Sequence, residues 1–283
     1  MNDPLLARGK VSIVIPYYNQ GLTLPETLAS IEQVGSDTIA EVIIVNDGSN
    51  EPATCQVLKH LDTSKYKIVH QPNQGLPSAR NAGIEIAKGE FILPLDSDDL
   101  IRRAFFDLGV ELLIQNPQVG VVYGDAEYFG ERTGPWKVAE FDWRLLVLRN
   151  YIASCALYRK SVWESVGGYD GNMRLGLEDW DYWMRVALRG WKFVHIEEIA
   201  FDYRVRQGSM ARGTERHLTE IAAHIFAKPE YAILKEFRNQ GLELEQLLRR
   251  HNSKEYKVGS SIVAPLRKVK RLLFSPLRGR STT

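Results

Sequence analysis

The sequence is poor in the residues and segments that mark several classes of protein. It has 2 cysteines in 283 residues, Cys55 and Cys155, too few for a small fold held by disulfides. We therefore expect both thiols to be reduced and to lie in the core. The chain contains no apolar run of about 18 residues and no signal-like segment at its N-terminus. It is therefore expected to be cytoplasmic and to lack a membrane-spanning helix.

The net charge is also small, with 36 basic against 35 acidic residues, but the charges are distributed unevenly. Residues 249–283 hold ten basic residues and a single acid, Glu255, so the rest of the chain is net acidic. An acidic body argues against nucleic acid as its main partner, because binding phosphates needs a basic face.

The basic C-terminal segment needs its own explanation. Over 260–280 the basic residues are interleaved with apolar ones, a pattern typical of segments that lie on an anionic membrane surface. A solvated terminal tail fits this pattern equally well, and nucleic-acid binding by the tail is a third alternative.

Through the first hundred residues, apolar β-branched runs alternate with helix-like stretches. The expected strands are 11–18, 40–47, 66–72 and 90–96, and the expected helices between them are 22–33, 51–61 and 78–88. Near-continuous apolar strands separated by helices indicate a parallel sheet covered on both faces. The sequence therefore predicts an α/β fold with a Rossmann-like, mostly parallel central sheet flanked by helices.

Beyond residue 99 the alternation is less regular. We expect a helix over 100–115 capped by Asp98 or Asp99, strands over 119–130 and 191–205, and a helix over 178–189. Helical patterns over 215–227 and 231–250 predict a helical C-terminal appendage. The expected organisation is a main domain (1–210, with halves 11–99 and 100–210), a helical extension (211–257) and a basic amphipathic tail (258–283).

Each of the first four expected strands ends in a polar cluster. These clusters are PYYN (16–19), NDGS (46–49), QPNQG (71–75) and DSDD (96–99). In an open parallel sheet, ligands bind outside the carboxyl ends of the strands. One such cluster would be explained as a turn, but four of them predict a binding site at one edge of the sheet.

The acids at the end of the fourth strand suggest a metal. Extended geometry would place Asp96 and Asp98 on the same side of the chain. With Asp99 they form three acids in four residues, which repel one another unless positive charge lies between them. Mn²⁺ or Mg²⁺ provides such charge and completes its shell with substrate phosphates. Capping of the next helix explains Asp99 equally well, and no His/Cys cluster has zinc spacing.

Six motifs together resemble those of family 2 glycosyltransferases. In order they are PYYN, VNDGS, QPNQGLPSARNAG, LDSDD, GLEDWDYWMR (176–185) and YRVRQGSM (203–210), and the resemblance covers about 11–210. It implies a GT-A fold, a nucleotide-sugar donor, a divalent metal and inverting transfer. It also implies that 11–99 is the nucleotide-binding half and 100–210 the acceptor-binding half.

The resemblance assigns roles in the nucleotide pocket. It implies that Asp47 contacts the base, with Pro16, Tyr18 and Ser49 in the pocket wall. LDSDD corresponds to the DXD signature of the family.

Further donor-binding residues follow from the same motifs. By resemblance, Asp96 bonds the ribose, Asp98 ligates the metal, and Ser97 lies among the donor-binding residues.

The run after the third strand supplies the remaining donor-binding candidates, Gln74 and Gly75 among them. Gly75 and Gly83 permit close backbone approach. Arg80 and Asn81 are expected either to contact the nucleotide or to order the carboxylates, although a surface position explains Arg80 equally well.

The later acidic motif is expected to supply the catalytic base. The resemblance makes Asp179 the general base and Glu178 an acceptor-binding partner, although acids are also common at a helix N-terminus. A pair between Asp181 and Arg185, four residues apart, is expected to be structural. Three aromatic residues of this motif could stack on a sugar, but packing in the core is favoured: Trp180, Tyr182 and Trp183.

The last motif departs from the family pattern. Many members have a His where this chain has Arg206. Arginine cannot ligate a metal but can bind a diphosphate, so we expect a phosphate contact there and fewer protein ligands for the ion. His195, on the preceding strand, is expected to be a packed core residue.

The predicted function is therefore inverting, metal-assisted transfer of a single sugar from a nucleotide sugar to a hydroxyl of a glycan or lipid-linked acceptor. UDP is the expected nucleotide, and cell-surface polysaccharide synthesis is the expected setting, at the inner face of the membrane if the tail binds there. Single transfer is favoured because the processive QxxRW signature is absent. The alternatives are a sugar nucleotidyltransferase and a non-catalytic peripheral-membrane binding protein.

Overall fold

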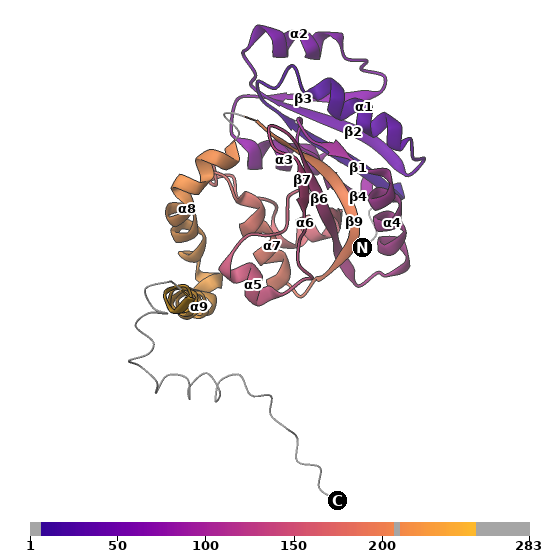
Figure 1. Ribbon diagram of the computed structural model, residues 1–283. Helices are drawn as coiled ribbons and strands as arrows, with labels where there is room; N and C mark the ends of the chain where they lie inside the picture. Colours follow the sequence, from indigo (N-terminus) through magenta and orange to yellow (C-terminus); the bar gives the residue numbers. More distant parts are fainter. Residues whose placement is uncertain (1–6, 207–209, 253–283) are drawn as a thin grey trace, which may run out of the picture. The chain divides into compact units, whose positions relative to one another are not determined.

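The computed structural model of the chain describes residues 7–206 and 210–252 (Figure 1). These residues form a nine-stranded sheet with helices on both faces. The strands are β1 (Ala7–Tyr17), β2 (Ile39–Asp47), β3 (Tyr66–Gln71), β4 (Gly89–Pro94), β5 (Leu100–Ile101), β6 (Val119–Gly130), β7 (Gly134–Trp136), β8 (Leu157–Arg159) and β9 (Lys192–Val205).

The strand order in the sheet is β3-β2-β1-β4-β8-β6-β9-β5, and β7 pairs with β6 outside this path. The first four strands of this path are parallel to one another, and β6 is parallel to β9. The short strand β8 is antiparallel to both of its neighbours, β4 and β6. The sheet is therefore mixed but mostly parallel, which confirms the expected α/β class.

The helices connect these strands and continue after the last one. They are α1 (Leu24–Val34), α2 (Pro52–His60), α3 (Leu76–Glu85), α4 (Arg103–Gln115), α5 (Trp143–Leu148), α6 (Lys160–Val166), α7 (Glu178–Leu188), α8 (Met210–Phe226) and α9 (Ala232–Asn252), with a 3₁₀ turn η1 (Pro229–Tyr231). Buried residues of α1 and α4 share one hydrophobic core with β1, β2 and β4. Helix α3 packs on the opposite face of the sheet. It contacts strand side chains that alternate with those of this core and therefore point to the other side.

Helix α3 lies unusually close to the sheet. A β-carbon added to Gly83 would lie closer than van der Waals contact to the side chains of Val14 in β1 and Val45 in β2. The glycine therefore permits close approach of a helix to two strands, and this approach fixes the position of the other residues of α3.

The segment 100–115 differs from its expected form. Leu100 and Ile101 pair antiparallel with β9, and the helix begins only at Arg103. The side chain of Asp99 accepts a hydrogen bond from the backbone N–H of Arg204 (2.9 Å). The prediction that Asp98 or Asp99 caps this helix was wrong, because a strand pairing made by two apolar residues separates the acids from the helix.

The chain divides into two compact units, the first ending at Pro229 and the second beginning at Glu230. The first unit contains the whole sheet and α1 to α8, and α9 lies in the second. The predicted functional boundaries at 99, 210 and 257 stay predictions, and the basic tail (258–283) lies outside the described residues. Within 7–206 and 210–252, no helix is both long and apolar enough to cross a membrane.

Candidate active site

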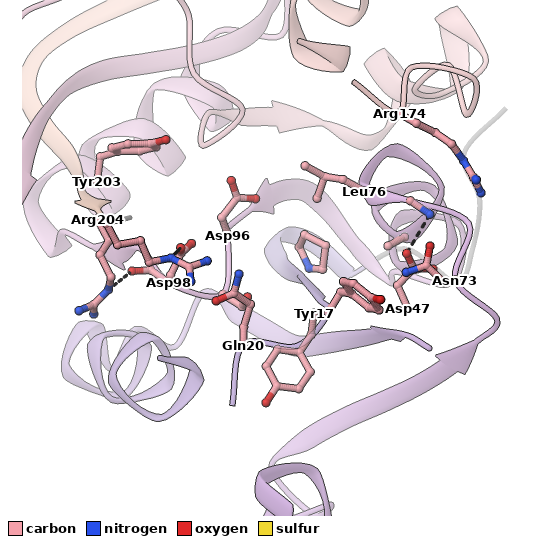
Figure 2. A pocket seen from close by; sticks show the side chains of 16 residues that line it. Tyr17, Gln20, Asp47, Asn73, Leu76, Asp96, Asp98, Arg174, Tyr203 and Arg204 are labelled. Atoms are coloured by element: carbon pink, nitrogen blue, oxygen red, sulfur yellow. Dashed lines mark hydrogen bonds and ion pairs between the residues drawn. The ribbon is translucent and has the colours of Figure 1, made fainter. Parts of the chain in front are cut away.

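A pocket of about 370 Å³ opens beyond the carboxyl ends of β1, β2 and β4. Figure 2 shows Asp47 and Asn73 at one end, Asp98 and Arg204 at the other, and Asp96 between them. The predicted donor-binding residues that line it are Pro16, Tyr18, Asp47, Gly75, Asp96, Ser97, Asp98 and Arg206. The structure thus brings together residues from five separate sequence motifs.

Asp47 organises one end of the pocket. Its Oδ1 accepts hydrogen bonds from Gln71 Nε2 (2.7 Å) and the Gln74 backbone N–H (2.8 Å). Its Oδ2 accepts one from the Gly75 N–H (2.8 Å). The carboxylate therefore holds the 71–75 loop against the end of β2, and Gln74 takes part through its backbone rather than as a lining residue.

Two other predicted residues make structural contacts next to the pocket. Ser49 Oγ accepts a hydrogen bond from the Asn19 N–H (3.1 Å) and so joins the loops after β1 and β2. Asn81 donates to the Tyr169 carbonyl oxygen (2.8 Å) and accepts from the Tyr169 N–H (2.8 Å) and Trp163 Nε1 (3.0 Å). Asn81 therefore ties α3 to the segment after α6.

The acids after β4 form a turn rather than an extended segment, since the Asp99 N–H donates to the Asp96 carbonyl oxygen (3.1 Å). The turn, not strand alternation, directs Asp96 and Asp98 into the pocket. Burial and the neighbouring charge of Asp96 raise the pKa of Asp98, and Arg206 opposes this shift. Burial and the charges of Asp98 and Asp96 raise the pKa of Asp99 more strongly.

Each acid of this turn faces an arginine from another element. Arg80 of α3 contacts Asp96 (2.6 Å), Arg206 contacts Asp98 (3.1 Å), and Arg204 holds Asp99 through its backbone, as described above. Arginines therefore supply part of the positive charge that the sequence pattern attributed to a metal.

Asp96 and Asp98 are the candidate protein ligands for a divalent cation. In the described part of the chain, no three His, Cys, Asp or Glu residues are grouped as a metal cluster. Asp96 and Asp98 both line the pocket, and Mg²⁺ in phosphate sites is commonly bound by one or two carboxylates plus the substrate phosphates. The two side chains fit a cation that binds together with a diphosphate, not one held by protein ligands alone.

Arg80 connects the acidic turn to the later acidic motif. Its side chain is 1% exposed and contacts Asp96, Glu178 and Ser154 Oγ (3.0 Å). Glu178 lies 98 residues beyond Arg80 in the chain. One buried guanidinium therefore brings the two acidic motifs to the same place.

Asp179 lies next to this arginine in the first turn of α7. Its Oδ1 accepts hydrogen bonds from Asn150 Nδ2 (3.0 Å) and from the Trp180 N–H (2.8 Å). Burial and then the charge of Glu178 raise the pKa of Asp179 to about 7, against the lowering effect of Arg80. A carboxyl that titrates near neutral pH is suited to act as a general base.

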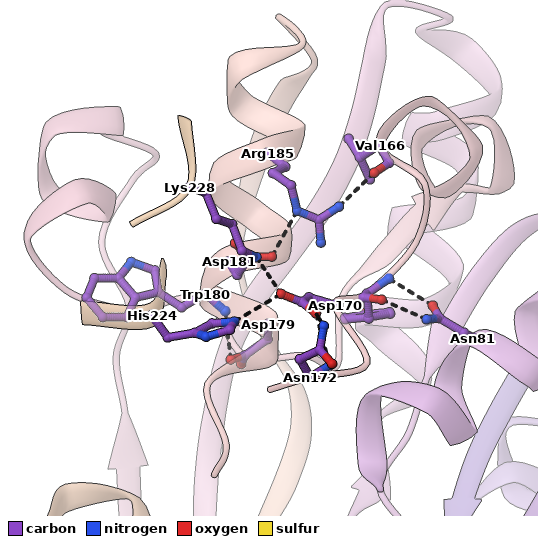
Figure 3. A network of polar contacts seen from close by, with 11 residues as sticks. Asn81, Val166, Asp170, Asn172, Asp179, Trp180, Asp181, Arg185, His224 and Lys228 are labelled. Carbon is purple, nitrogen blue, oxygen red and sulfur yellow. Dashed lines mark hydrogen bonds and ion pairs between the residues drawn. The ribbon is translucent and has the colours of Figure 1, made fainter. Parts of the chain in front are cut away.

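Helix α7 is held by a network of ion pairs (Figure 3). Fully buried Asp181 contacts Arg185 Nε (2.9 Å) and Lys228 Nζ (2.7 Å). Asp170 also contacts Lys228 (2.7 Å) and His224 Nε2 (3.2 Å). The expected structural pair of Asp181 and Arg185 is confirmed.

The aromatic side chains of α7 are also buried, which confirms packing in the core: Trp180, Tyr182 and Trp183. His195 is buried as expected and lies 3.2 Å from Asp125 Oδ1. Cys55 and Cys155 are free thiols, of which Cys155 is buried.

Several lining residues were missed by the sequence analysis: Gln20, Asn73, Leu76, Arg174, Tyr203 and Arg204. A signal existed for Tyr203 and Arg204, which stand in the quoted YRVRQGSM motif. Arg204 also stands two residues before Arg206, a spacing that places both on one side of an extended chain. Arg174 lies in a loop without periodicity, where its approach to Gly75 depends on tertiary packing alone.

Comparison with known sequences places this chain in a family. The profile described as Glycosyl transferase family 2 matches residues 12–179. An uncharacterized glycosyltransferase of Haemophilus influenzae is 28% identical over 184 residues, which cover 62% of this chain and 61% of that protein. The putative glycosyltransferase EpsH of Bacillus subtilis is 43% identical over 94 residues, covering 32% and 27%.

A further relative, glycosyltransferase GlyG of Streptococcus pneumoniae, is 27% identical over 225 residues, covering 71% of this chain and 73% of GlyG. By contrast, the chain spans less than two thirds of the length of the H. influenzae and B. subtilis relatives.

Solved structures share the fold. Residues 1–349 of S. aureus TarS, in a crystal structure with UDP-GlcNAc, superpose with a TM-score of 0.63 at 20% identity, covering 92% of this chain and 77% of that chain. The corresponding structure with UDP gives a TM-score of 0.61 at 19% identity, covering 93% and 78%. The likeness confirms the GT-A-like fold expected from the sequence.

Proposed function

Because this chain belongs to glycosyltransferase family 2, we propose that it transfers one sugar, with inversion, from a UDP-sugar to a hydroxyl of a glycan or lipid-linked acceptor. The bound UDP and UDP-GlcNAc named for the TarS structures support a nucleotide-sugar donor. Family membership favours this function over a sugar nucleotidyltransferase or a non-catalytic membrane-binding protein. Synthesis of a cell-surface polysaccharide at the inner membrane face is the setting we propose.

The observation that carries the proposal is the position of Arg80 between Asp96 and Glu178. Asp96 lines the pocket that would hold the donor, and Glu178 directly precedes Asp179, the proposed base. A glycosyl transfer needs the donor carbon and the base within reach of one acceptor hydroxyl. A shared buried cation supports such an arrangement.

In the donor pocket, the end formed by Asp47 and Asn73 would receive the nucleoside, with Tyr18 and Pro16 beside it. The diphosphate would lie toward Asp98, where Arg206 supplies a guanidinium. Arginine is suited to this position because its planar donors match phosphate oxygens.

A Mn²⁺ or Mg²⁺ held by Asp98, with Asp96 nearby, would supply positive charge for the departing diphosphate. The reaction itself requires proton transfer and bond exchange at one carbon. The acceptor oxygen forms a bond to C1 of the sugar while the bond from C1 to the phosphate oxygen breaks. The nucleoside diphosphate leaves with the electron pair, and the hydroxyl proton passes to the Asp179 carboxylate.

The hydrogen bonds of Asp179 suit this role. Asn150 and the Trp180 N–H both donate to Oδ1 and thereby fix the orientation of the carboxylate. Oδ2 would then receive the proton. Glu178, held by Arg80, would bind the acceptor from the adjacent position.

A thermal-shift screen tests the proposal. UDP, GDP, dTDP and their sugar conjugates are added singly with Mn²⁺ or Mg²⁺, and the melting temperature of the full chain is measured. A ligand at about 100 times its Kd stabilises the folded state by about 2.7 kcal/mol. Stabilisation by UDP and a UDP-sugar, followed by UDP release from that sugar, is expected. Stabilisation by none of these compounds would contradict the proposal.

A further inference from the structure

The two arginines at the end of β9 contact the acidic turn in different ways. Arg204 makes two contacts with the turn, and each involves one backbone group. Its backbone N–H donates to Asp99 Oδ1 (2.9 Å), and its side-chain Nε donates to the Asp98 carbonyl oxygen (2.9 Å). Arg206 instead contacts the Asp98 carboxylate, from Nε to Oδ2 (3.1 Å). The turn is therefore held in place by contacts that do not involve Arg206.

Exposure separates these arginines further. The side chain of Arg204 is 16% exposed, whereas those of Arg206 and Asp98 are 35% and 20% exposed. Arg206 and Asp98 also both line the pocket. A ligand in the pocket can therefore reach both members of this ion pair without unfolding the turn.

Two positive groups can pair with the Asp98 carboxylate: the Arg206 guanidinium and a divalent cation. A divalent cation bound to Asp98 would lie within a few ångströms of the Arg206 guanidinium, and the two positive charges would repel in a partly buried site. A diphosphate carries negative charge that attracts both of them. The side chain of Arg206 is long and its charged end can turn toward phosphate oxygens while its backbone stays in place.

We propose that Arg206 competes with the divalent cation for Asp98, and that the donor diphosphate resolves this competition by drawing Arg206 to itself. The inference rests on the proposed function, because it requires a diphosphate in this pocket. Binding of the cation and of the nucleotide is then coupled through one side chain. Coupling between two sites is reciprocal and typically changes affinity by about 5- to 150-fold.

The experiment measures binding of Mn²⁺ alone to the full chain, by electron paramagnetic resonance of free Mn²⁺, with and without UDP. Arg206→Gln removes the competing charge while keeping a polar side chain that can donate hydrogen bonds. We expect this variant to bind Mn²⁺ alone at least about 5-fold more tightly than the unsubstituted chain. The increase in Mn²⁺ affinity caused by UDP should shrink in the variant, and UDP should bind it more weakly without metal.

Arg174→Gln is the matched control. It removes the same charge from the same pocket, but at the end near Gly75 and not at Asp98. It should leave the affinity for Mn²⁺ alone within about 2-fold, whereas Asp98→Asn should abolish that binding. Arg206→Met serves as a second uncharged variant, and circular dichroism checks that each variant is folded.

No gain in Mn²⁺ affinity in either Arg206 variant would overturn the inference, and so would an equal gain in Arg174→Gln. The proposed function fails separately, if the unsubstituted chain binds neither UDP nor a UDP-sugar in the presence of Mn²⁺. The comparison with Mn²⁺ alone needs no nucleotide, so the two failures can be told apart.

Discussion

The acidic turn at 96–99 and the acidic start of α7 at 178–181 both place several carboxylates within four residues, but their surroundings differ. In the turn, every acid faces an arginine: Arg80, Arg206 and the backbone of Arg204 contact Asp96, Asp98 and Asp99. The arginines oppose the effect of burial and of the neighbouring acids, which raise the pKa of Asp98 and Asp99.

At the start of α7 only the outer acids face cations. Glu178 contacts Arg80, and Asp181 contacts Arg185 and Lys228. Asp179 lies between them, and its direct hydrogen-bond donors, Asn150 and the Trp180 N–H, are both neutral.

Under the proposed function, this difference distinguishes the acids expected to bind ligands from the acid expected to act as the base. Acids that face cations are engaged in ion pairs, and Asp96 and Asp98 among them line the pocket where a metal or the donor would bind. Asp179, whose hydrogen-bond donors are neutral, has its pKa raised to about 7, and burial also raises the pKa of Asp98 and Asp99. The comparison predicts that Asp179 differs in role from each of its charged neighbours.

The largest expected effect is that of Asp179→Asn. The amide cannot accept a proton at neutral pH, so the rate of UDP release from the preferred donor should fall roughly 10²- to 10⁴-fold. Affinity for UDP, measured by calorimetry, should stay close to that of the unsubstituted chain. A rate within threefold of the original would end the assignment of Asp179 as the base.

The matched control changes a paired acid of the same helix turn. Asp181→Asn leaves Lys228 and Arg185 with less compensating charge and should lower the free energy of unfolding, by about 3–5 kcal/mol if the pair behaves as a buried one. The rate per folded molecule should nevertheless stay within about threefold. A rate loss as large as that of Asp179→Asn would remove the distinction between these acids.

Arg80→Ala should be the most destabilising change at the donor side. It leaves Asp96 and Glu178 without their shared cation, which costs about 3–5 kcal/mol for a buried pair broken on one side. Urea denaturation measures the loss. Arg80→Lys keeps the charge and should recover part of it, whereas a loss below about 1 kcal/mol in the alanine variant would show that Arg80 does not hold the two motifs together.

Asn81→Ala should affect stability but not binding of the nucleotide. The partly buried side chain makes three hydrogen bonds to Tyr169 and Trp163, and leaving such partners unsatisfied costs about 1–3 kcal/mol. Thermal denaturation measures this cost, and calorimetry with UDP provides the comparison. Weaker UDP binding in a folded variant would assign Asn81 to the donor pocket after all.

The rate should also change gradually with pH. Because the pKa of Asp179 is raised to about 7, this carboxyl is protonated below that pH and cannot accept the acceptor proton. The logarithm of kcat/KM should therefore rise with a slope of one up to about pH 7 and level off above it. A profile that is flat from about pH 5 to 7 would contradict a base with this pKa.

The first half of the fold could be predicted closely from the sequence. β1, β2 and β4 are largely buried parallel strands, so their sequences contain apolar runs that end at turn residues. β3 is a partly exposed edge strand with a shorter apolar run. The short elements β5, β7 and β8 were not predicted, because strands of two or three residues carry no periodicity. Their existence depends on pairing with partners far along the chain, such as Phe201 and Asp202 for β5.

The site was predictable where its residues end a strand. Asp47, Asp96 and Asp98 follow apolar runs, and all three line the pocket. The role of Arg80 could not be decided from the sequence, since one of its partners lies 98 residues away. Arg174 was missed for the same physical reason, because its loop approaches the pocket only after folding.

Gly83 carries no charge and lies on the sheet side of α3, yet the electrostatics of the site depend on it. It stands less than one helical turn from Arg80, and the sheet leaves no space for a methyl group at this position. A larger residue at this position would displace the helix from β1 and β2. The Arg80 guanidinium would then move away from the carboxylates of Asp96 and Glu178. Hydrogen, the smallest possible side chain, thus sets the depth at which the central positive charge of this enzyme is seated.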